Sequence, residues 1–319
     1  MVKEGVVEWQ EWFKSKMCDS DACPTDATLR TYGYSMMWLQ ERMEGFDREK
    51  EIVPEADKVL AYMDENKVSV NRKLASYTAM KVFHRCKKDD DRSKCYCTPL
   101  VLCKRQQDAE YHKQRRTEHQ SKNWVEFKVI KKFAAELRKK IFALEKNELW
   151  DKNALAEAQL AFILQYTMTF PIRRDLCTVQ WGVEPSEDYN YIDTKTHTIV
   201  YNKHKLQRWR KEPFKHQLSR PMWRLLQLLI KQQKLRDHTS GTILVNRYGR
   251  KMTKNGYSSW FKREMKKCPG CECKEVGCLI LRHSVITHKR GGCMTNAQRD
   301  KFAAQCMHSA SCNDTYRVH

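Results

Sequence analysis

The chain has 319 residues, of which 60 are lysine or arginine and 39 are aspartate or glutamate, so its formal net charge is +21. A hydrophobic content of 41% is enough for the cores of two domains and excludes a chain that is disordered throughout. No stretch approaches the roughly 20 apolar residues that cross a bilayer, and the amino end lacks the apolar core of an export signal. We therefore expect an intracellular protein without a membrane partner, and cations spread along most of the chain favour nucleic acid as the partner.

Residues 1–120 are predicted to form a helical domain. Apolar side chains recur at steps of three and four residues from Leu29 to Met43, as on the buried face of a helix. A second helix is expected from Val68 to Arg85, before a cysteine-rich loop that contains Asp89 to Asp91. The polar stretch 104–122 has almost no apolar period, which is typical of an exposed helix or a linker, so we place a domain boundary near residue 120.

Residues 121–319 are predicted to form a second domain that is helical with a small sheet. Helical spacing runs from Trp124 to Leu144, and 155–169 is apolar on most sides, as expected for a helix at the centre of a core. A further helix is expected from Pro221 to Lys234, with Ser219 as its cap. Short strand patterns separated by turns occur at 189–192, 198–201 and 243–245. The predicted fold class is therefore mainly α with a small antiparallel β-sheet.

Fourteen cysteines in a large chain without an export signal are expected to be reduced thiols, some of them on metal. One set has the spacing C-x-x-C-x-C-x4-C in a short loop at 268–278. Four thiolates at this spacing could bind one structural zinc ion, and four thiols without a metal are an equal alternative. This first set is Cys268, Cys271, Cys273 and Cys278. A second, less regular set with a weaker claim to metal is Cys86, Cys95, Cys97 and Cys103.

Three polar clusters in the second domain are candidates for chemistry, and a strand that runs out into cations lies between the first two. Taken singly, each has an ordinary explanation as a solvated helix end, a surface lysine or a packed ring. Their order along the chain is not explained in that way. The candidate residues are Arg173, Arg174, Lys203, Lys205, Arg282, His283, His308 and Tyr316.

In that order the residues resemble the tyrosine recombinase (phage integrase) family, whose catalytic domains carry Arg, Lys, His/Lys-x-x-Arg, His/Trp and Tyr in sequence. The resemblance covers about 120 to 319, and the helical region before it has a looser likeness to the family's core-binding domain, which clamps DNA. The Pro-x-Arg-Arg form at Pro171 to Arg174 and the short step from His308 to Tyr316 are most similar to recombinases of eukaryotic mobile elements and large DNA viruses. The resemblance thus implies a core-binding domain at 1–120 and a catalytic domain at 121–319.

The resemblance assigns a role to five positions. Arg173 matches the first family arginine, and Arg282 in Leu-Arg-His matches the second. Lys205 matches the lysine of the hairpin, and His308 in Met-His-Ser matches the late histidine. Tyr316 matches the nucleophile.

Alternatives remain open at three of the family's positions. A shift of one residue gives the first arginine to Arg174, and Lys203 lies on the same strand face as the preferred lysine. The family usually has His or Lys three residues before the second arginine, where this chain has Leu279. Either His283 or His288 replaces that group, or the enzyme works with one polar group fewer.

The implied reaction needs no catalytic cofactor, so any zinc would be structural. Two guanidiniums clamp the non-bridging oxygens of a phosphodiester, the tyrosine forms a 3′-phosphotyrosine, and the lysine protonates the departing 5′ oxygen. The expected partners are double-stranded DNA and further copies of the chain, as a tetramer on DNA; the expected location is with the DNA, hence the nucleus if the host is eukaryotic. Two alternatives are a type IB topoisomerase and a catalytically inactive, zinc-stabilised DNA-binding protein.

Overall fold

The computed structural model describes residues 4–17, 24–146, 149–204, 212–238, 241–291, 294–308, 316 and 318. The chain divides into two compact units, Met1–Lys113 (unit 1) and Gln114–His319 (unit 2). The expected boundary near 120 falls a few residues later, inside the polar stretch. That stretch is shared, because α6 (Cys97–His112) lies in unit 1 and α7 (Glu118–Asn123) in unit 2. None of the helices described is long and apolar enough to cross a membrane.

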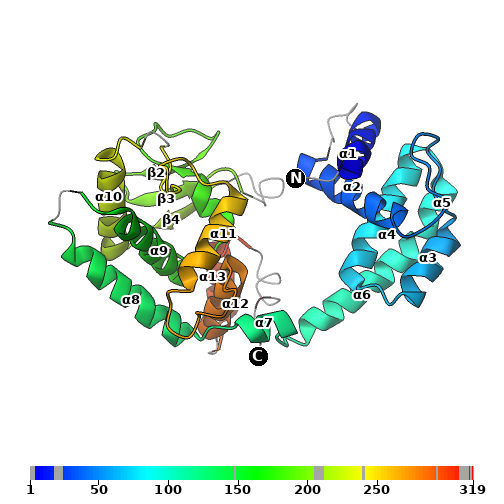
Figure 1. Ribbon diagram of the computed structural model, residues 1–319. Helices are drawn as coiled ribbons and strands as arrows, with labels where there is room; N and C mark the ends of the chain where they lie inside the picture. The colour runs from blue at the N-terminus through cyan, green and yellow to red at the C-terminus, as the bar shows by residue number, and fades with distance from the viewer. Residues whose placement is uncertain are drawn as a thin grey trace. The chain divides into compact units, whose positions relative to one another are not determined.

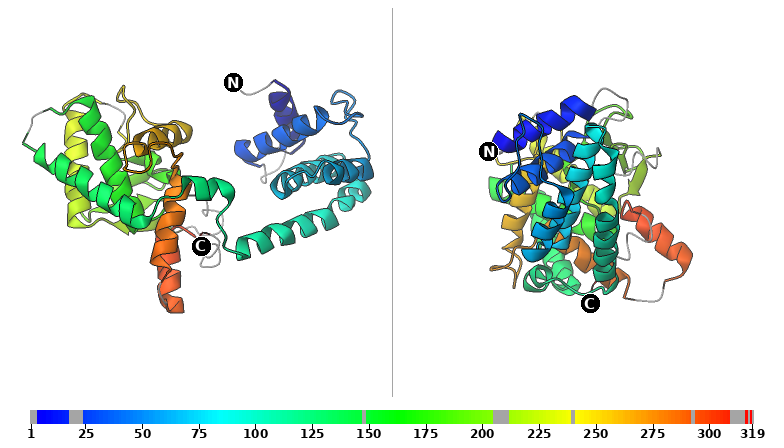
Figure 2. Two further views of the ribbon diagram at one scale, coloured as in Figure 1. Left: turned by 60° about the horizontal axis from the view of Figure 1, so that its bottom comes forward. Right: turned by 90° about the vertical axis from the view of Figure 1, so that its right-hand side faces the viewer.

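Unit 1 is helical throughout its described part. The predicted helices are present as α2 (Asp26–Gln40) and α4 (Val70–Cys86), and their apolar faces meet at Leu29, Met36 and Phe83 in one core. α4 lies beside α6, as the right-hand view of Figure 2 shows. The remaining helices are α1 (Glu4–Met17), α3 (Ala56–Glu65) and α5 (Asp90–Cys95).

The crossing of α1 and α2 depends on a glycine. A Cβ atom added at Gly33 would lie 2.6 Å from the backbone oxygen of Val6, which is closer than non-bonded atoms can approach. The absence of a side chain therefore lets the two helices pack with their backbones in near contact.

The cysteine-rich segment after α4 is not the loop that the sequence suggested. Asp89 caps α5 by accepting a hydrogen bond from the backbone N–H of Arg92, and α6 starts only two residues after α5 ends. Cys95 is exposed on α5, whereas Cys103 is buried on α6. The aspartates that we took as a break instead cap α5 and form its first turn, where negative charge is favourable.

Unit 2 is built around α9 (Lys152–Thr169), which is buried along most of its length. It begins at Asp151, whose side chain accepts a hydrogen bond of 2.6 Å from the N–H of Ala154. α9 lies between α8 (Phe127–Ala143) and α10 (Arg220–Lys234), as Figure 1 shows. It also contacts α11 (Lys254–Met265) and α12 (Cys278–Lys289), and α13 (Asn296–Gln305) follows. An apolar helix at the centre of the core is thus confirmed.

The described part of unit 2 contains one sheet of four short strands in the order β1-β2-β3-β4. They are β1 (Val179–Gln180), β2 (Asn190–Asp193), β3 (Thr198–Tyr201) and β4 (Phe214–Gln217). The pairs β2–β3 and β3–β4 are antiparallel, as expected, but β1 pairs with β2 in parallel. The strand predicted at 243–245 does not form as a strand. The segment makes two isolated antiparallel bridges, Thr242 with Gln180 of β1 and Val245 with Lys251, and the N–H of Ile243 donates to the backbone oxygen of Val179. The fold class, mainly α with a small sheet, is confirmed.

Candidate functional site

The first cationic group of the site is Arg173, three residues beyond the C-cap of α9 at Phe170 and directly before the 3-10 helix η1 (Arg174–Thr178). Its Nη2 donates a hydrogen bond of 3.3 Å to the phenol oxygen of Tyr316, which lies 143 positions later in the chain. Lys289 of α12 donates a bond of 3.2 Å to the backbone oxygen of Thr169, and so holds the end of α9 against the helix that carries the second arginine.

The second cationic group is Arg282, which is 1% exposed on α12. Its Nη2 donates to the backbone oxygen of Cys306 at 2.7 Å and lies 2.7 Å from Nε2 of His308. The guanidinium carbon lies 4.6 Å from the centre of the Tyr316 ring, a cation–π contact. Both predicted arginines therefore contact the same phenol, one at its oxygen and one at its face.

Tyr316 is held by α12 through its backbone as well as through its ring. Nδ1 of His283 lies 2.8 Å from the backbone oxygen of Tyr316, and the N–H of Val318 donates to Oγ1 of Thr287 at 3.1 Å. The ring centres of His283 and His308 each lie 4.9 Å from that of the tyrosine. The phenol is thus enclosed by two imidazoles and two guanidiniums.

The contacts of His283 define its protonation. Since Nδ1 faces a carbonyl oxygen it must donate, and Nε2, which lies 3.2 Å from the amide nitrogen of Gln120, must accept. Burial lowers the pKa of His283 below its ordinary value, opposed by the bond to Tyr316 and assisted by the charge of Arg282. A neutral imidazole with its proton on Nδ1 is therefore the form that fits this site.

The alternative residues lie elsewhere or are engaged differently. Arg174 is exposed and donates to Asn255 and Ser258 of α11, at 3.3 and 3.5 Å. Lys203 forms an exposed ion pair of 3.8 Å with Asp188. The preferred hairpin lysine, Lys205, lies outside the described residues.

The position of the missing family histidine is also visible. Leu279 is 55% exposed on the first turn of α12. His288 stacks on Phe127, with ring centres 4.0 Å apart, and so takes part in packing. Of the two substitutes considered, only His283 contacts the tyrosine.

A buried polar network supports the segment that carries Arg173. The ring of Phe170 stacks on His216 of β4 at 4.3 Å, and Nδ1 of His216 lies 2.5 Å from the hydroxyl of Tyr166 on α9. That hydroxyl is also 2.9 Å from the hydroxyl of Tyr201 at the end of β3. Burial lowers the pKa of His216 to about 3, so the ring is neutral. The network joins the end of α9 to the strand that leads toward the lysines.

The cysteines of the 268–278 loop do not converge on one point. Cys268 and Cys271 are fully buried and share a hydrogen bond that raises the pKa of Cys268 and lowers that of Cys271. Cys278 bonds to Tyr257, with burial raising its pKa to about 11, and Cys273 is exposed. Among the residues with described positions, no three His, Cys, Asp or Glu side chains are grouped so that they could hold one metal ion. This arrangement therefore offers zinc at most two adjacent thiols. The set from Cys86 to Cys103, within the described residues, forms no such group of three either.

Three residues that contact the site were not found from the sequence: Gln120, Thr287 and Lys289. Thr287 lies one helical turn beyond His283, so a helical reading of 278–289 would have placed both on one face. Gln120 belongs to the polar stretch that we took for an exposed helix or a linker, and its role depends on tertiary contact.

Comparison with known proteins concerns the fold. No protein-family model matches the sequence, and no curated protein is similar to it in sequence. Among solved structures, that of XerA recombinase aligns with a TM-score of 0.42 and 13% identity, over 98% of this chain and 93% of that one. The structure of XerH site-specific recombinase bound to its difH substrate, a pre-cleavage complex, aligns with a TM-score of 0.47 and 13% identity, over 99% of this chain and 94% of that one.

Proposed function

We propose that the protein is a site-specific DNA recombinase that cleaves and rejoins DNA strands through a 3′-phosphotyrosine. One observation carries the proposal: Arg173, Arg282 and Tyr316, from distant parts of the chain, meet at one phenol. Removing guanidinium groups from water is costly, and a phosphodiester is an anion whose oxygens fit the paired donors of both forks. The meeting point is therefore suited to a phosphate beside a tyrosine oxygen.

The proposed reaction starts with an attack by the phenol oxygen of Tyr316 on phosphorus. The bond from tyrosine oxygen to phosphorus forms, the bond from phosphorus to the 5′ oxygen breaks, and the electron pair leaves with that oxygen. Arg173 and Arg282 stabilise the charge that gathers on the non-bridging oxygens. By the family resemblance, Lys205 gives the 5′ oxygen its proton, and His308 orients the phosphate or accepts the phenol proton.

The reversal of the same step rejoins a strand. Because the phosphotyrosine keeps the energy of the broken bond, a 5′ hydroxyl restores the phosphodiester without ATP and without a metal ion at the reacting phosphate. Exchange between two duplexes requires two cleavages on each, so we expect four copies of the chain to act together on double-stranded DNA. We expect unit 1 to serve as the DNA-clamping domain and the protein to work where the DNA is, in the nucleus if the host is eukaryotic.

The decisive experiment traps the covalent intermediate on a nicked duplex from which the 5′ fragment is lost after cleavage. We expect the wild-type chain and Tyr248→Phe, whose ring is 65% exposed, to form an adduct that resists denaturation, and Tyr316→Phe to form none. Absence of an adduct with a folded wild-type chain, across a library of duplex sequences, would leave only a DNA-binding protein.

Two adjacent arginines provide a matched pair for the clamp. Arg173→Ala should slow adduct formation about 100-fold or more, the usual cost of losing one donor to a developing oxyanion. Arg174→Ala should slow it less than tenfold, because that side chain donates to α11. The reverse ranking would show that the first arginine is assigned to the wrong residue.

A supercoiled plasmid without a recognition sequence distinguishes the nearest alternative reaction. A recombinase needs a pair of sites, so we expect no prompt relaxation at low protein concentration. Fast relaxation that is lost in Tyr316→Phe would instead identify a type IB topoisomerase.

A further inference from the structure

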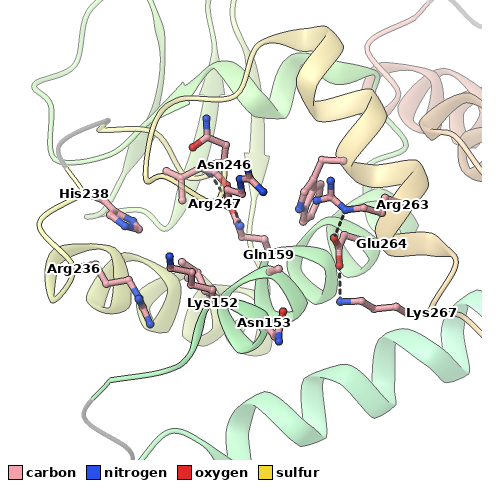
Figure 3. Close-up of a pocket in the computed structure, with 14 residues that line it drawn as sticks. Lys152, Asn153, Gln159, Arg236, His238, Asn246, Arg247, Arg263, Glu264 and Lys267 are labelled. Atoms are coloured by element: carbon pink, nitrogen blue, oxygen red, sulfur yellow. Dashed lines mark hydrogen bonds and ion pairs between the residues drawn. The ribbon is translucent and has the colours of Figure 1, made fainter.

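A second cationic site lies in unit 2, in a pocket of about 480 Å³. Its walls come from the first turn of α9, the segment after α10, the turn around Asn246 and the end of α11. Figure 3 shows Lys152, Arg236 and His238 on one side of this pocket and Arg263 with Lys267 on the other. The volume is within the range of about 300 to 1,000 Å³ that is usual for small-molecule sites.

The pocket is remote from the proposed reaction. α9 has 18 residues, and at 1.5 Å per residue its two ends are about 27 Å apart. Arg173 follows the last turn of α9, whereas Lys152 is its first residue. α11 separates the two sites in the same way: Arg174, next to Arg173, contacts its first turns, whereas Lys267 of the pocket follows its end. A duplex held at Tyr316 is therefore not expected to fill this pocket.

The charges of the pocket are not balanced within it. Among the described residues that line it, the permanent cations are Lys152, Arg236, Arg247, Arg263 and Lys267, and the one carboxylate is Glu264. That carboxylate is used by the end of α11, since Arg263 and Lys267 lie 3.2 and 2.6 Å from its oxygens. No ion pair joins Lys152 or Arg236 to any residue in the described ranges.

Two buried polar atoms in the pocket wall also lack a hydrogen-bond partner among the residues described. Nε of Arg236 and Nδ1 of His238 are buried and have no hydrogen-bond partner in the described part of the chain. The ring of His238 packs closely against Gly249, where a Cβ atom would lie 2.3 Å from the imidazole. Buried polar groups are normally paired, so two unpartnered atoms beside an excess of cations indicate an anionic ligand.

The remaining lining is apolar and partly aromatic. Leu155, Ala156, Val245 and Trp260 contribute this part of the surface. A sulfate-sized anion would leave it uncovered, whereas a ligand with a flat ring could cover it and place its phosphates against the cations. The concave form of the site also suits a small molecule better than the convex backbone of a duplex.

We propose that this pocket binds a nucleotide with two or more phosphates, its phosphates at Lys152, Arg236 and Arg247 and its base against the apolar lining. The site is separate from the phosphotyrosine chemistry and does not depend on it. It gives the protein a second ligand, a free nucleotide in addition to DNA.

The test is calorimetric titration of the full-length chain with magnesium-free ATP, tripolyphosphate and adenosine. We expect one ATP per chain, with at least tenfold weaker binding of tripolyphosphate and of adenosine. The double variant Lys152→Ala/Arg236→Ala should weaken ATP binding at least tenfold. The control Lys139→Ala, an exposed lysine on α8 outside the pocket, and Tyr316→Phe should each stay within twofold of the wild type.

Four results would overturn the proposal. They are no ATP binding by the wild-type chain, equal binding by the double variant, equal binding of ATP and tripolyphosphate, and a double variant that loses duplex affinity in parallel with ATP affinity. The last result would make the pocket part of a DNA surface. Circular-dichroism melting curves must show that the double variant is folded. Failure of adduct trapping would leave these binding results unchanged, so the two proposals can fail separately.

Discussion

Acid should destabilise unit 2 through its buried histidines, and His216 should contribute most because its pKa is shifted furthest. Its pKa falls from an ordinary 6.5 to about 3 because the ring is buried against Phe170 and the hydroxyl of Tyr166. Below pH 6.5 His216 therefore binds a proton in the unfolded chain but not in the folded chain. The stability that this histidine contributes is complete above pH 6.5 and is lost as the pH falls toward 3.

The size of the effect follows from the two pKa values. Each pH unit between them changes the free energy of unfolding by about 1.4 kcal/mol, so the loss is about 2.5 kcal/mol between pH 7 and 4.5 and approaches 5 kcal/mol near pH 3. His216→Gln cannot titrate and should lack this part of the pH dependence. It should cost about 1 kcal/mol at pH 7, since Tyr166 keeps the hydroxyl of Tyr201 as a partner.

Hydrogen exchange read by mass spectrometry on peptides of α9 measures the stability of unit 2 by itself. We expect the difference between pH 7 and 4.5, corrected for intrinsic exchange, to be about 2.5 kcal/mol smaller in His216→Gln than in the wild type. His119→Gln, at an exposed position of the same unit, should keep the wild-type difference. An unchanged pH dependence in the His216 variant would refute the claim that this ring is buried in its neutral form.

Three more predictions concern packing, the tyrosine and metal. Gly33→Ala should lower the free energy of unfolding of unit 1 by about 1 to 3 kcal/mol. Gly5→Ala, where a Cβ meets only a flexible side chain at 3.4 Å, should change it by less than about 0.5 kcal/mol. Urea titration measures both values, and equal effects would contradict the close helix crossing. His283→Ala should slow adduct formation about tenfold by releasing the carbonyl of Tyr316, and His283→Asn, which can restore the donor, should recover most of the rate in the trapping assay; no recovery would argue against an anchoring role. If zinc is structural, Cys271→Ser should release it and destabilise unit 2, as measured by atomic absorption and thermal melting, and a folded, active wild-type protein without zinc would exclude the ion.

Periodic apolar patterns allowed the helices of the core to be predicted. The segment Leu155 to Thr169 differs from α9 only at its start, because the cap at Asp151 adds one turn ahead of the apolar run. β4 was missed, since Phe214–Gln217 places a lysine and a histidine in a strand of four residues. Its inner histidine is buried through a bond to Tyr166, which local sequence does not reveal. The parallel pairing of β1 is equally a property of tertiary structure.

Residue order suggested which groups belong to the site, but not how each one points. Arg173 and Arg174 are neighbours of the same type, and only the turn into η1 sends one to the phenol and the other to α11. The role of His283 as a backbone anchor arises because the chain returns to α12 after α13. Neither the two neighbouring arginines nor the family's residue order shows which side chain contacts the phenol and which holds the backbone.

The contacts of residues 316 and 318 with α12 determine when the surroundings of the tyrosine become ordered. The carbonyl of residue 316 and the amide of residue 318 are both fastened to this helix, one turn apart at His283 and Thr287, and Arg282 projects from the same helix. The entropy of ordering residues 316 and 318 is thus lost during folding, before any substrate arrives. Such preorganisation predicts an attacking group that is ready on first encounter, so that the slow step of a catalytic cycle would fall to the gathering of DNA and partner copies.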